Sequence, residues 1–344
     1  MLTSVVAVFT RIYVTKHSNI MYSIKDISYR TVFVLDCIFP RELHVHQGLF
    51  EIKDLNTGKA LTRIPFQKLL AIFAIGHASI TTPLIDKCRK YNVALIVLKP
   101  NLRPVFFWSY GVEGNFLLHQ KQYAHQKEDL HIAKQLVNNK LSNQLLMLKR
   151  TRRKDPMTMN AIESISYCLS HLEETTEYNA LMGLEGRAAK HYFRCYFMDY
   201  DWSKRRPRLK NDYINTLLDI GYTLLFNLIE CYARIFGFDP YIGVYHCMWY
   251  QRKSFICDIM EPFRNIIEHT TRCALGRKQF NPEHFENKKG EYHLKHEHTM
   301  DYYKVFFIAL IAYKQDLFEY MYHYYRSFMK DEGDGIYPKF TPFK

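Results

Sequence analysis

The spacing of apolar residues changes between residues 110 and 120, and this change constrains the fold more than any other feature of the chain. Before it, apolar and polar residues alternate over 43–46 and 50–53, which is typical of half-buried strands. Further along, VALIVLK (93–99) and VFFWS (105–109) are short apolar runs typical of buried strands. The first third of the chain is therefore predicted to be rich in β-structure.

After the change, apolar residues recur at helical spacing. The clearest case is 213–236, where they fall on one stripe before a glycine and a proline end the pattern. The segment 131–150 shows the same spacing, and 305–329 predicts one helix or a pair of helices. A shorter helical pattern lies in the first third, at PFQKLLAIFAIG (65–76), and we predict a helix there that ends at Gly76.

The domain organisation follows from these patterns and from the length of 344 residues, which suggests about two domains. The first folded pattern begins near Tyr29, which raises the hypothesis that Met21 is the true first residue. The last residues are polar and rich in glycine and proline, so we expect them to fray. We place four segments: an N-terminal extension (1–21), a β-rich domain (22–112), an α-helical domain (118–330) and a flexible tail (331–344).

The composition narrows the class of protein. The net charge is +13 and the pI is about 9.2, which favours binding to nucleic acid or to an acidic membrane surface. No run of 18 apolar residues occurs, so no transmembrane helix is predicted. The eight cysteines form no C-x-x-C pair, which indicates reduced thiols of a cytosolic protein rather than a zinc ribbon. No P-loop motif is present.

One mostly apolar stretch, HCMWYQRKSFICDIME (246–261), carries an imidazole and two carboxylates. If the stretch around them is helical, Asp258 and Glu261 share a face, because they are three residues apart. Together with His246, they could bind a divalent cation of the Mg²⁺ or Mn²⁺ type. The alternative is an exposed acidic helix face with a buried histidine.

A second candidate is GLEGRAAKHYF (183–193), where Glu185 stands between two glycines. Glycines allow a backbone or a phosphate to approach closely. We expect Glu185 at a helix start, where the alternative is a carboxylate that simply complements the helix dipole.

Two basic runs, KRTRRK (149–154) and KRRPRLK (204–210), are candidates for binding phosphates, and nearby aromatic residues could stack on bases. The alternatives are solvated loops or a nuclear import signal. The histidine-rich piece HLKHEHTMDYY (293–303) has no clear metal-ligand spacing, and we predict a polar loop or helix start.

Four motifs occur in a characteristic order along the chain: GLEG (183–186), RRPRLKNDYIN (205–215), GFDPYIGVYH (237–246) and DIMEPFR (258–264). With these motifs, the chain resembles the universal CRISPR-associated spacer-acquisition integrase family. Upstream, GHASITTPLIDKC (76–88) looks like the family's first-domain helix entry and NKLSNQLLMLKR (139–150) like its first long helix. The resemblance covers about residues 22 to 330. His119 stands where an Arg is expected, and Asn265 replaces a usual Pro.

The resemblance implies an α+β fold with a small N-terminal β-sandwich-like domain and a larger α-helical C-terminal domain. It implies a cytoplasmic homodimer that works with a small ferredoxin-like CRISPR-associated subunit. The assembly would join the 3′-hydroxyl ends of short double-stranded DNA to CRISPR repeat DNA by transesterification. The implied holders of the divalent metal, Mg²⁺ or Mn²⁺, are Glu185, His246 and Glu261, and Asp258 lies at or beside the metal.

The basic residues expected at the DNA are Lys204, Arg205, Arg206, Arg208 and Arg264. Arg264 could clamp the scissile phosphate or pair with a ligand carboxylate, and we favour the second role. Two alternative functions remain open at this point: a transposase-like integrase of a mobile element, and a non-catalytic nucleic-acid-binding scaffold. A membrane-surface role is disfavoured, because no basic amphipathic helix with an aromatic apolar face stands out.

Overall fold

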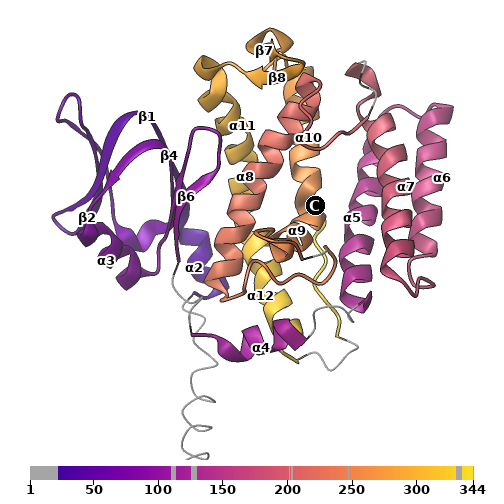
Figure 1. Cartoon of the computed structure of the whole chain (residues 1–344), viewed down its shortest axis with the longest axis horizontal. Helices are drawn as coiled ribbons and strands as arrows, with labels where there is room; N and C mark the ends of the chain where they lie inside the picture. The colour runs from indigo at the N-terminus through magenta and orange to yellow at the C-terminus, as the bar shows by residue number, and fades with distance from the viewer. Residues whose placement is uncertain are drawn as a thin grey trace, which may run out of the picture.

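The computed structural model describes residues 22–109, 114–124, 130–200, 202, 204–246, 248–330 and 335–343. Figure 1 shows a sheet at one end of the molecule, helices in the middle, and a further group of helices at the other end. The predicted N-terminal extension with Met21, part of the predicted domain boundary (110–113), Cys247 and part of the predicted tail (331–334 and 344) lie outside the described residues.

Within the described residues, the N-terminal unit forms one six-stranded sheet in the order β3-β2-β1-β4-β5-β6. β1 runs parallel to β4 and antiparallel to β2, and a register shift between Cys37 and Arg41 bends it. The strands and the short helices around them are β1 (Thr31–His46), β2 (Leu49–Asp54), β3 (Ala60–Ile64), β4 (Leu69–Ile80), β5 (Ala94–Leu98), β6 (Pro104–Trp108), α2 (Ile24–Tyr29), η1 (Phe66–Lys68) and α3 (Thr82–Tyr91).

The sheet is covered on both faces. On one face, residues of β1, β2, β4 and β5 enclose a small core with Leu84 and Cys88 of α3. On the other face, Phe73 of β4 packs edge-on against Phe307 of α11, with ring centroids 5.7 Å apart. The main hydrophobic core runs from this face into the helices, so the two parts of the chain are packed together.

The prediction of a helix over 65–76 is wrong. Only Phe66–Lys68 forms a helical turn, and β4 begins at Leu69. Residues 69–75 are all buried, because β4 is covered on both faces, and such a strand shows a continuous apolar run instead of alternation. Gly76 does not cap a helix: its φ is +114°, and a Cβ there would lie 2.5 Å from the carbonyl oxygen of Cys37 on β1.

The helices after residue 115 lie close to the segments predicted from helical spacing. The segment 213–236 forms α8, 131–150 forms α5, and 305–329 falls in a pair of helices, α11 and α12. The α+β fold class is therefore confirmed. The elements are α4 (Phe116–Ala124), α5 (Leu130–Arg150), α6 (Pro156–Ser170), α7 (Tyr178–Tyr196), η2 (Met198–Tyr200), α8 (Tyr213–Ile235), α9 (Ser254–Met260), η3 (Glu261–Phe263), α10 (Arg264–Gly276), η4 (Pro282–His284), β7 (Phe285–Lys288), β8 (Glu291–Leu294), η5 (His296–His298), α11 (Thr299–Ala312) and α12 (Lys314–Lys330).

The predicted flexible tail is instead packed over residues 335–343. Tyr337 and Phe340 are 2% and 4% exposed. Asn139 and Asn143 of α5 both donate to the carbonyl oxygen of Phe340, at 2.7 and 3.0 Å. Two aromatic side chains and these buried amides outweigh the polar composition on which the prediction rested.

None of the described helices combines the length and the apolar character that a membrane span requires.

Candidate active site

The side chains predicted to hold a metal come from three separate elements and converge. Glu185 lies in the interior of α7, His246 in the loop before α9, and Glu261 at the start of η3. Nε2 of His246 lies 3.8 Å from Oε1 of Glu261. The expected helix start at Glu185 is wrong, because α7 begins at Tyr178, so a dipole-capping role does not explain this carboxylate.

Asp258 lies behind the imidazole rather than between the carboxylates. It is fully buried, and its Oδ1 lies 2.7 Å from Nδ1 of His246. The same carboxylate accepts the backbone N–H groups of Val244, Tyr245 and His246 at 2.6, 3.0 and 2.8 Å. With Nδ1–H donating to Asp258, the lone pair of His246 is on Nε2, which is the nitrogen that faces Glu261.

Gly243 explains why the loop before α9 can wrap so closely around Asp258. A Cβ at this position would lie 2.5 Å from Oδ2 of Asp258 and 2.8 Å from the backbone of Ser254. The three successive backbone N–H groups of residues 244–246 can therefore turn inward onto one carboxylate.

A lysine that the sequence did not single out completes the site. The ammonium group of Lys140 on α5 contacts Oε1 of Glu185 and lies 2.6 Å from Oε2 of Glu261. Burial by itself would lower the pKa of Lys140, but the two carboxylates raise it above its ordinary value. Lys140 is only 6% exposed, so a positive charge is held in the interior between two negative ones.

Two cations, Arg264 and Lys140, and the imidazole of His246 surround Glu261. Burial would raise the pKa of Glu261, but Arg264 and Lys140 lower it below its ordinary value, so the carboxylate is ionised at pH 7. The guanidinium of Arg264 lies 2.8 Å from Oε1 of Glu261, which is the second of the two roles expected for it. The same guanidinium stacks over the ring of Tyr222, 4.8 Å from its centroid.

Another buried carboxylate, Glu268 on α10, was not predicted. It accepts hydrogen bonds from the hydroxyl groups of Tyr192 and Tyr222 at 2.8 and 2.7 Å, and from the amide of Asn265 at 3.0 Å. Burial raises the pKa of Glu268 above its ordinary value. Glu268 thus holds Tyr222, on which Arg264 stacks, and Asn265 takes part in this network where a proline was expected.

The basic residues expected at the DNA separate into two kinds. Arg205 lies 2.5 Å from Asp219 and donates to Asn215, so its guanidinium is held within the protein. Lys204 and Arg208 are exposed, whereas Arg206 is partly buried. Arg264 is held by Glu261 as described above. The exposed members, rather than the whole run, are therefore available to an external ligand.

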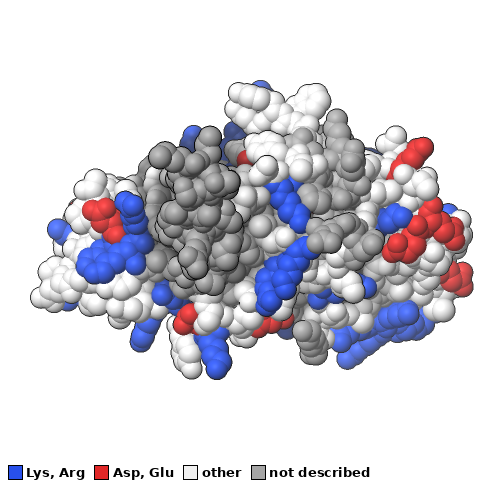
Figure 2. All heavy atoms as spheres, turned by 90° about the horizontal axis from the view of Figure 1, so that it is seen from below, with Lys and Arg blue, Asp and Glu red and all other residues white. Residues whose placement is uncertain are grey.

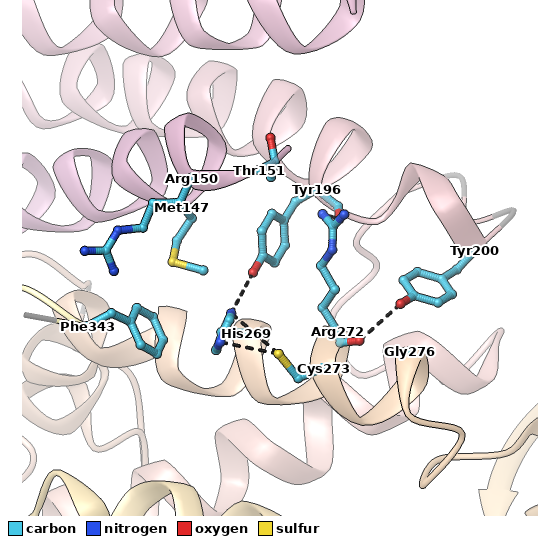
Figure 3. Close-up of a pocket in the computed structure, with 10 residues that line it drawn as sticks. All are labelled: Met147, Arg150, Thr151, Tyr196, Tyr200, His269, Arg272, Cys273, Gly276 and Phe343. Carbon is cyan, nitrogen blue, oxygen red and sulfur yellow. Dashed lines mark hydrogen bonds between the residues drawn. The ribbon is translucent and has the colours of Figure 1, made fainter. Parts of the chain in front are cut away.

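A pocket of about 500 Å³ opens between the C-terminal part of α5, the end of α7 and α10 (Figure 3). His269 lies between Tyr196 and Cys273, at 3.3 Å from the Tyr196 hydroxyl and 3.3 Å from the Cys273 sulfur. Burial, together with the nearby arginines, lowers the pKa of His269, so this imidazole is neutral at pH 7. None of the ten described residues that line the pocket is acidic, and Arg150 and Arg272 give it a positive character.

The comparisons with known proteins show the family of the chain. A family model described as CRISPR associated protein Cas1 matches residues 39–306. The chain belongs to the Cas1 family. The CRISPR-associated endonuclease Cas1 1 of Archaeoglobus fulgidus is 28% identical over 279 residues, which cover 73% of this chain and 80% of that relative. The CRISPR-associated endonuclease Cas1 1 of Chlorobaculum tepidum is 30% identical over 244 residues, which cover 65% and 71%.

Solved structures show that this member shares the Cas1 fold. A Cas1 protein from Thermotoga maritima is 18% identical with a TM-score of 0.72, covering 89% of this chain and 100% of that one. A casposase bound to integration product is 20% identical with a TM-score of 0.70, covering 88% and 92%. A chain of a Cas6-RT-Cas1–Cas2 complex has a TM-score of 0.74 at 19% identity. That match covers 92% of this chain and only 37% of the other, which is much longer.

Proposed function

We propose that this Cas1 family protein is a metal-dependent DNA integrase of CRISPR adaptation. It would join the 3′-hydroxyl ends of short DNA fragments to the CRISPR repeat by transesterification. The observation that carries the proposal is that Lys140 contacts both Glu185 and Glu261, and that Nε2 of His246 faces Glu261 while Asp258 holds the other imidazole nitrogen. Relatives named CRISPR-associated endonucleases and a casposase bound to integration product support this chemistry.

The residues present fit a divalent cation. One imidazole nitrogen and two carboxylates form a donor set suited to Mn²⁺ or Mg²⁺. The position of the Lys140 ammonium supports this, because it shows that Glu185 and Glu261 together stabilise a positive charge between them. We propose Glu185, His246 and Glu261 as the groups that would hold the metal, and Asp258 as the residue that positions His246 without binding the metal.

When bound there, a divalent cation supplies a Lewis acid for phosphodiester chemistry. The chain's own residues prepare the site. Arg264 and Lys140 keep Glu261 ionised and in place, and Tyr245 donates to Oε2 of Glu185 at 3.2 Å. A protein nucleophile is not needed, because the attacking group is the 3′-hydroxyl of the DNA. At Gly183 and Gly186, apart from the adjacent residues and the nearby backbone of α7, no described atom lies within 4 Å of where a Cβ would be, so the helix surface next to Glu185 is open to a ligand.

The proposal is tested with an in vitro integration assay. The purified chain, with and without its small partner subunit, is given a duplex with 3′-hydroxyl ends, a plasmid carrying the CRISPR repeat, and Mg²⁺ or Mn²⁺. We expect Glu185→Ala, His246→Ala and Glu261→Ala each to reduce strand joining by at least about 100-fold, since even outer partners of metal ligands contribute 10- to 100-fold. DNA binding should remain. Glu163→Ala, an exposed residue of α6, is the matched control. Strand joining that survives all three substitutions would rule the proposal out.

DNA binding is proposed to use the exposed basic residues. Figure 2 shows Lys and Arg side chains in several separate groups on one face, rather than in one continuous stripe. Lys204 and Arg208 are the exposed members of the 204–210 run, so each substitution to alanine should weaken binding to all DNA sequences and lower the salt slope by about 1. Neither substitution should change stability. Arg205→Ala should instead destabilise the fold by about 1.5–3 kcal/mol, because Asp219 loses its cationic partner and keeps only the backbone N–H of Arg208.

Salt-dependent binding assays and urea unfolding of these three variants distinguish basic residues that contact DNA from the arginine that is held within the protein. An unchanged salt slope in Lys204→Ala and Arg208→Ala would contradict the assignment of the DNA contacts.

The partners are also part of the proposal. We propose a homodimer that binds a small ferredoxin-like CRISPR-associated subunit, together with short double-stranded DNA and CRISPR repeat DNA. The structural likeness to a chain of a Cas6-RT-Cas1–Cas2 complex supports such an assembly. Light scattering of the chain with and without the small subunit measures both associations.

A further inference from the structure

A second group of histidine and carboxylate side chains lies in the sheet, far from the candidate active site. His44 and His46 are on β1, and Glu51 is on β2. His44 and His46 are two residues apart on one strand, so both side chains lie on the same face. Glu51 is the direct antiparallel partner of His44, which places its side chain on that face as well. In Figure 1, β2 is at the opposite end of the molecule from α6 and α7.

These three side chains, which we name the hairpin cluster, have the spacing of a metal site. Nε2 of His44 lies 3.1 Å from Oε1 of Glu51. One ligand atom from each of the three residues can be chosen so that all lie within 4.8 Å of one another. Ligand atoms about 2.0–2.2 Å from a tetrahedral metal are about 3.3–3.6 Å apart. A small rotation of the side chains would bring the three ligand atoms to this spacing. Among the described residues, this is the group of three that meets the spacing.

The carboxylate of the hairpin cluster is prepared to bind a cation. Glu51 is only 5% exposed, and Arg63 on β3 contacts its Oε2. The Nε–H group of Arg63 donates to Oε2 of Glu51, which fixes the orientation of the carboxylate. Because Arg63 contacts Oε2, the other oxygen, Oε1, remains directed toward His44. Carboxylates that bind metals are commonly held in this way by an outer hydrogen-bond donor.

Hydrogen bonding alone does not account for the arrangement. Nδ1 of His44 is buried and has no hydrogen-bond partner among the described atoms, although a histidine retained for its hydrogen bonds would normally use both nitrogens. The side chains of His44 and Arg63 are 19% and 49% exposed, so an ion can reach the cluster from solvent.

We propose that His44, His46 and Glu51 bind one zinc ion, with water at the fourth position of a tetrahedral site. Two imidazoles with one carboxylate favour Zn²⁺, or a similar transition ion, over Mg²⁺, which prefers oxygen ligands. The ion joins β1 to β2 by side chains at a point where the backbone of the two strands is already paired. This site is independent of the proposed integrase chemistry, because it shares no residue with Glu185, His246 or Glu261.

The test measures zinc bound by the whole chain in which the candidate active site is disabled. The starting protein carries His246→Ala, which removes the imidazole of the candidate active site and leaves Lys140 and Arg264 with their carboxylates; it is stripped with a chelator and is dialysed against Zn²⁺. Elemental analysis should then find one zinc per chain. Addition of Co²⁺ in place of Zn²⁺ should give the visible absorption bands of a tetrahedral site.

Two further variants are made in that background. His44→Gln with His46→Gln keeps side chains of similar size and polarity, and it should lose the zinc and the cobalt bands. His77→Gln, an exposed histidine of β4, is the matched control and should keep both. Circular dichroism checks that the sheet is retained; if the double variant unfolds, the single variant His46→Gln replaces it and should bind zinc at least about tenfold more weakly. The proposal is overturned if the starting protein binds no zinc, or if zinc binding is the same with and without these histidines.

Discussion

The candidate active site and the hairpin cluster both combine histidine with carboxylate, yet they place a cationic side chain differently. In the active site, the Lys140 ammonium lies between Glu185 and Glu261. In the hairpin cluster, Arg63 contacts Oε2 of Glu51, and Oε1 lies 3.1 Å from Nε2 of His44. Under the two proposals, Lys140 lies where the active-site metal would bind, and Arg63 lies outside the position proposed for zinc.

The number of carboxylates accounts for this difference. The Glu261 side chain is 2% exposed and faces the partly exposed Glu185 across Lys140, so the cation between them offsets the cost of two neighbouring negative charges. The hairpin cluster has one carboxylate, and Arg63 already offsets its charge at Oε2. We infer that a metal entering the active site takes the place of the Lys140 ammonium. At the hairpin cluster, the zinc ion would be added without displacing a side chain.

Removal of the Lys140 ammonium should have the largest effect, a loss of stability against urea. Lys140→Met leaves Glu185 without its cation and Glu261 with Arg264 alone, and breaking a buried ion pair in this way costs about 3–5 kcal/mol. Urea unfolding in metal-free buffer measures the loss, and addition of Mn²⁺ should restore part of it. Lys134→Met on the same helix, whose ammonium donates to a backbone carbonyl at the surface, is the control and should change little. Equal losses in the two variants, or no recovery with Mn²⁺, would show that Lys140 is not an internal substitute for the metal.

Substitution of Asp258 should have the next largest effect, a loss of metal affinity at the candidate active site. Asp258→Asn disturbs the hydrogen bond that fixes the His246 ring, and loss of such an outer partner costs about 10- to 100-fold in metal affinity. Calorimetric titration with Mn²⁺ measures the change, and zinc binding at the hairpin cluster should be unaffected. Asp301→Asn, at an exposed position of α11, is the control. If Mn²⁺ affinity is unchanged in Asp258→Asn, the positioning role is incorrect.

Substitution of Arg63 should have the smallest effect, a modest loss of stability and of zinc affinity at the hairpin cluster. Arg63→Gln keeps a hydrogen-bond donor near Glu51 but removes the charge, and because Arg63 is half exposed, the pair contributes at most about 1 kcal/mol to stability. Zinc affinity at the hairpin cluster should fall by no more than about tenfold. Arg41→Gln, which removes the neighbouring pair with Asp54 on the same hairpin, should leave zinc affinity unchanged. A complete loss of zinc in Arg63→Gln would mean that this arginine builds the site instead of supporting it.

The sequence predicted those parts of the fold that depend on local periodicity. The helices α5 and α8 were correctly placed because each buries one clear apolar face. The strand β4 was not, because a strand buried on both faces and a buried helix show the same continuous apolar run. Tyr337 and Phe340 were expected in a flexible tail, because their contacts are made with residues about 200 positions earlier and leave no local pattern.

The same limit applies to the candidate site. Glu185, His246 and Glu261 were found through motifs, and the structure brings them together. Lys140 could not be found, because it lies in an ordinary helical pattern and its partners are 45 or more residues away. The alternation of His44 and His46 with apolar residues was visible in the sequence. Their juxtaposition with Glu51 depends on the register of β1 against β2, which the sequence pattern did not specify.

The packing of residues 335–343 against α5 has a consequence for the order of folding. Asn139 and Asn143 reach Phe340 across 201 and 197 residues of chain. Relative to a contact that closes a loop of a dozen residues, closing one of about 200 costs about 2.5 kcal/mol more in chain entropy. Contacts of such sequence separation form late when other elements are already in place. We therefore expect the segment 335–343 to dock on α5 late in folding, after α5 has packed against the other helices.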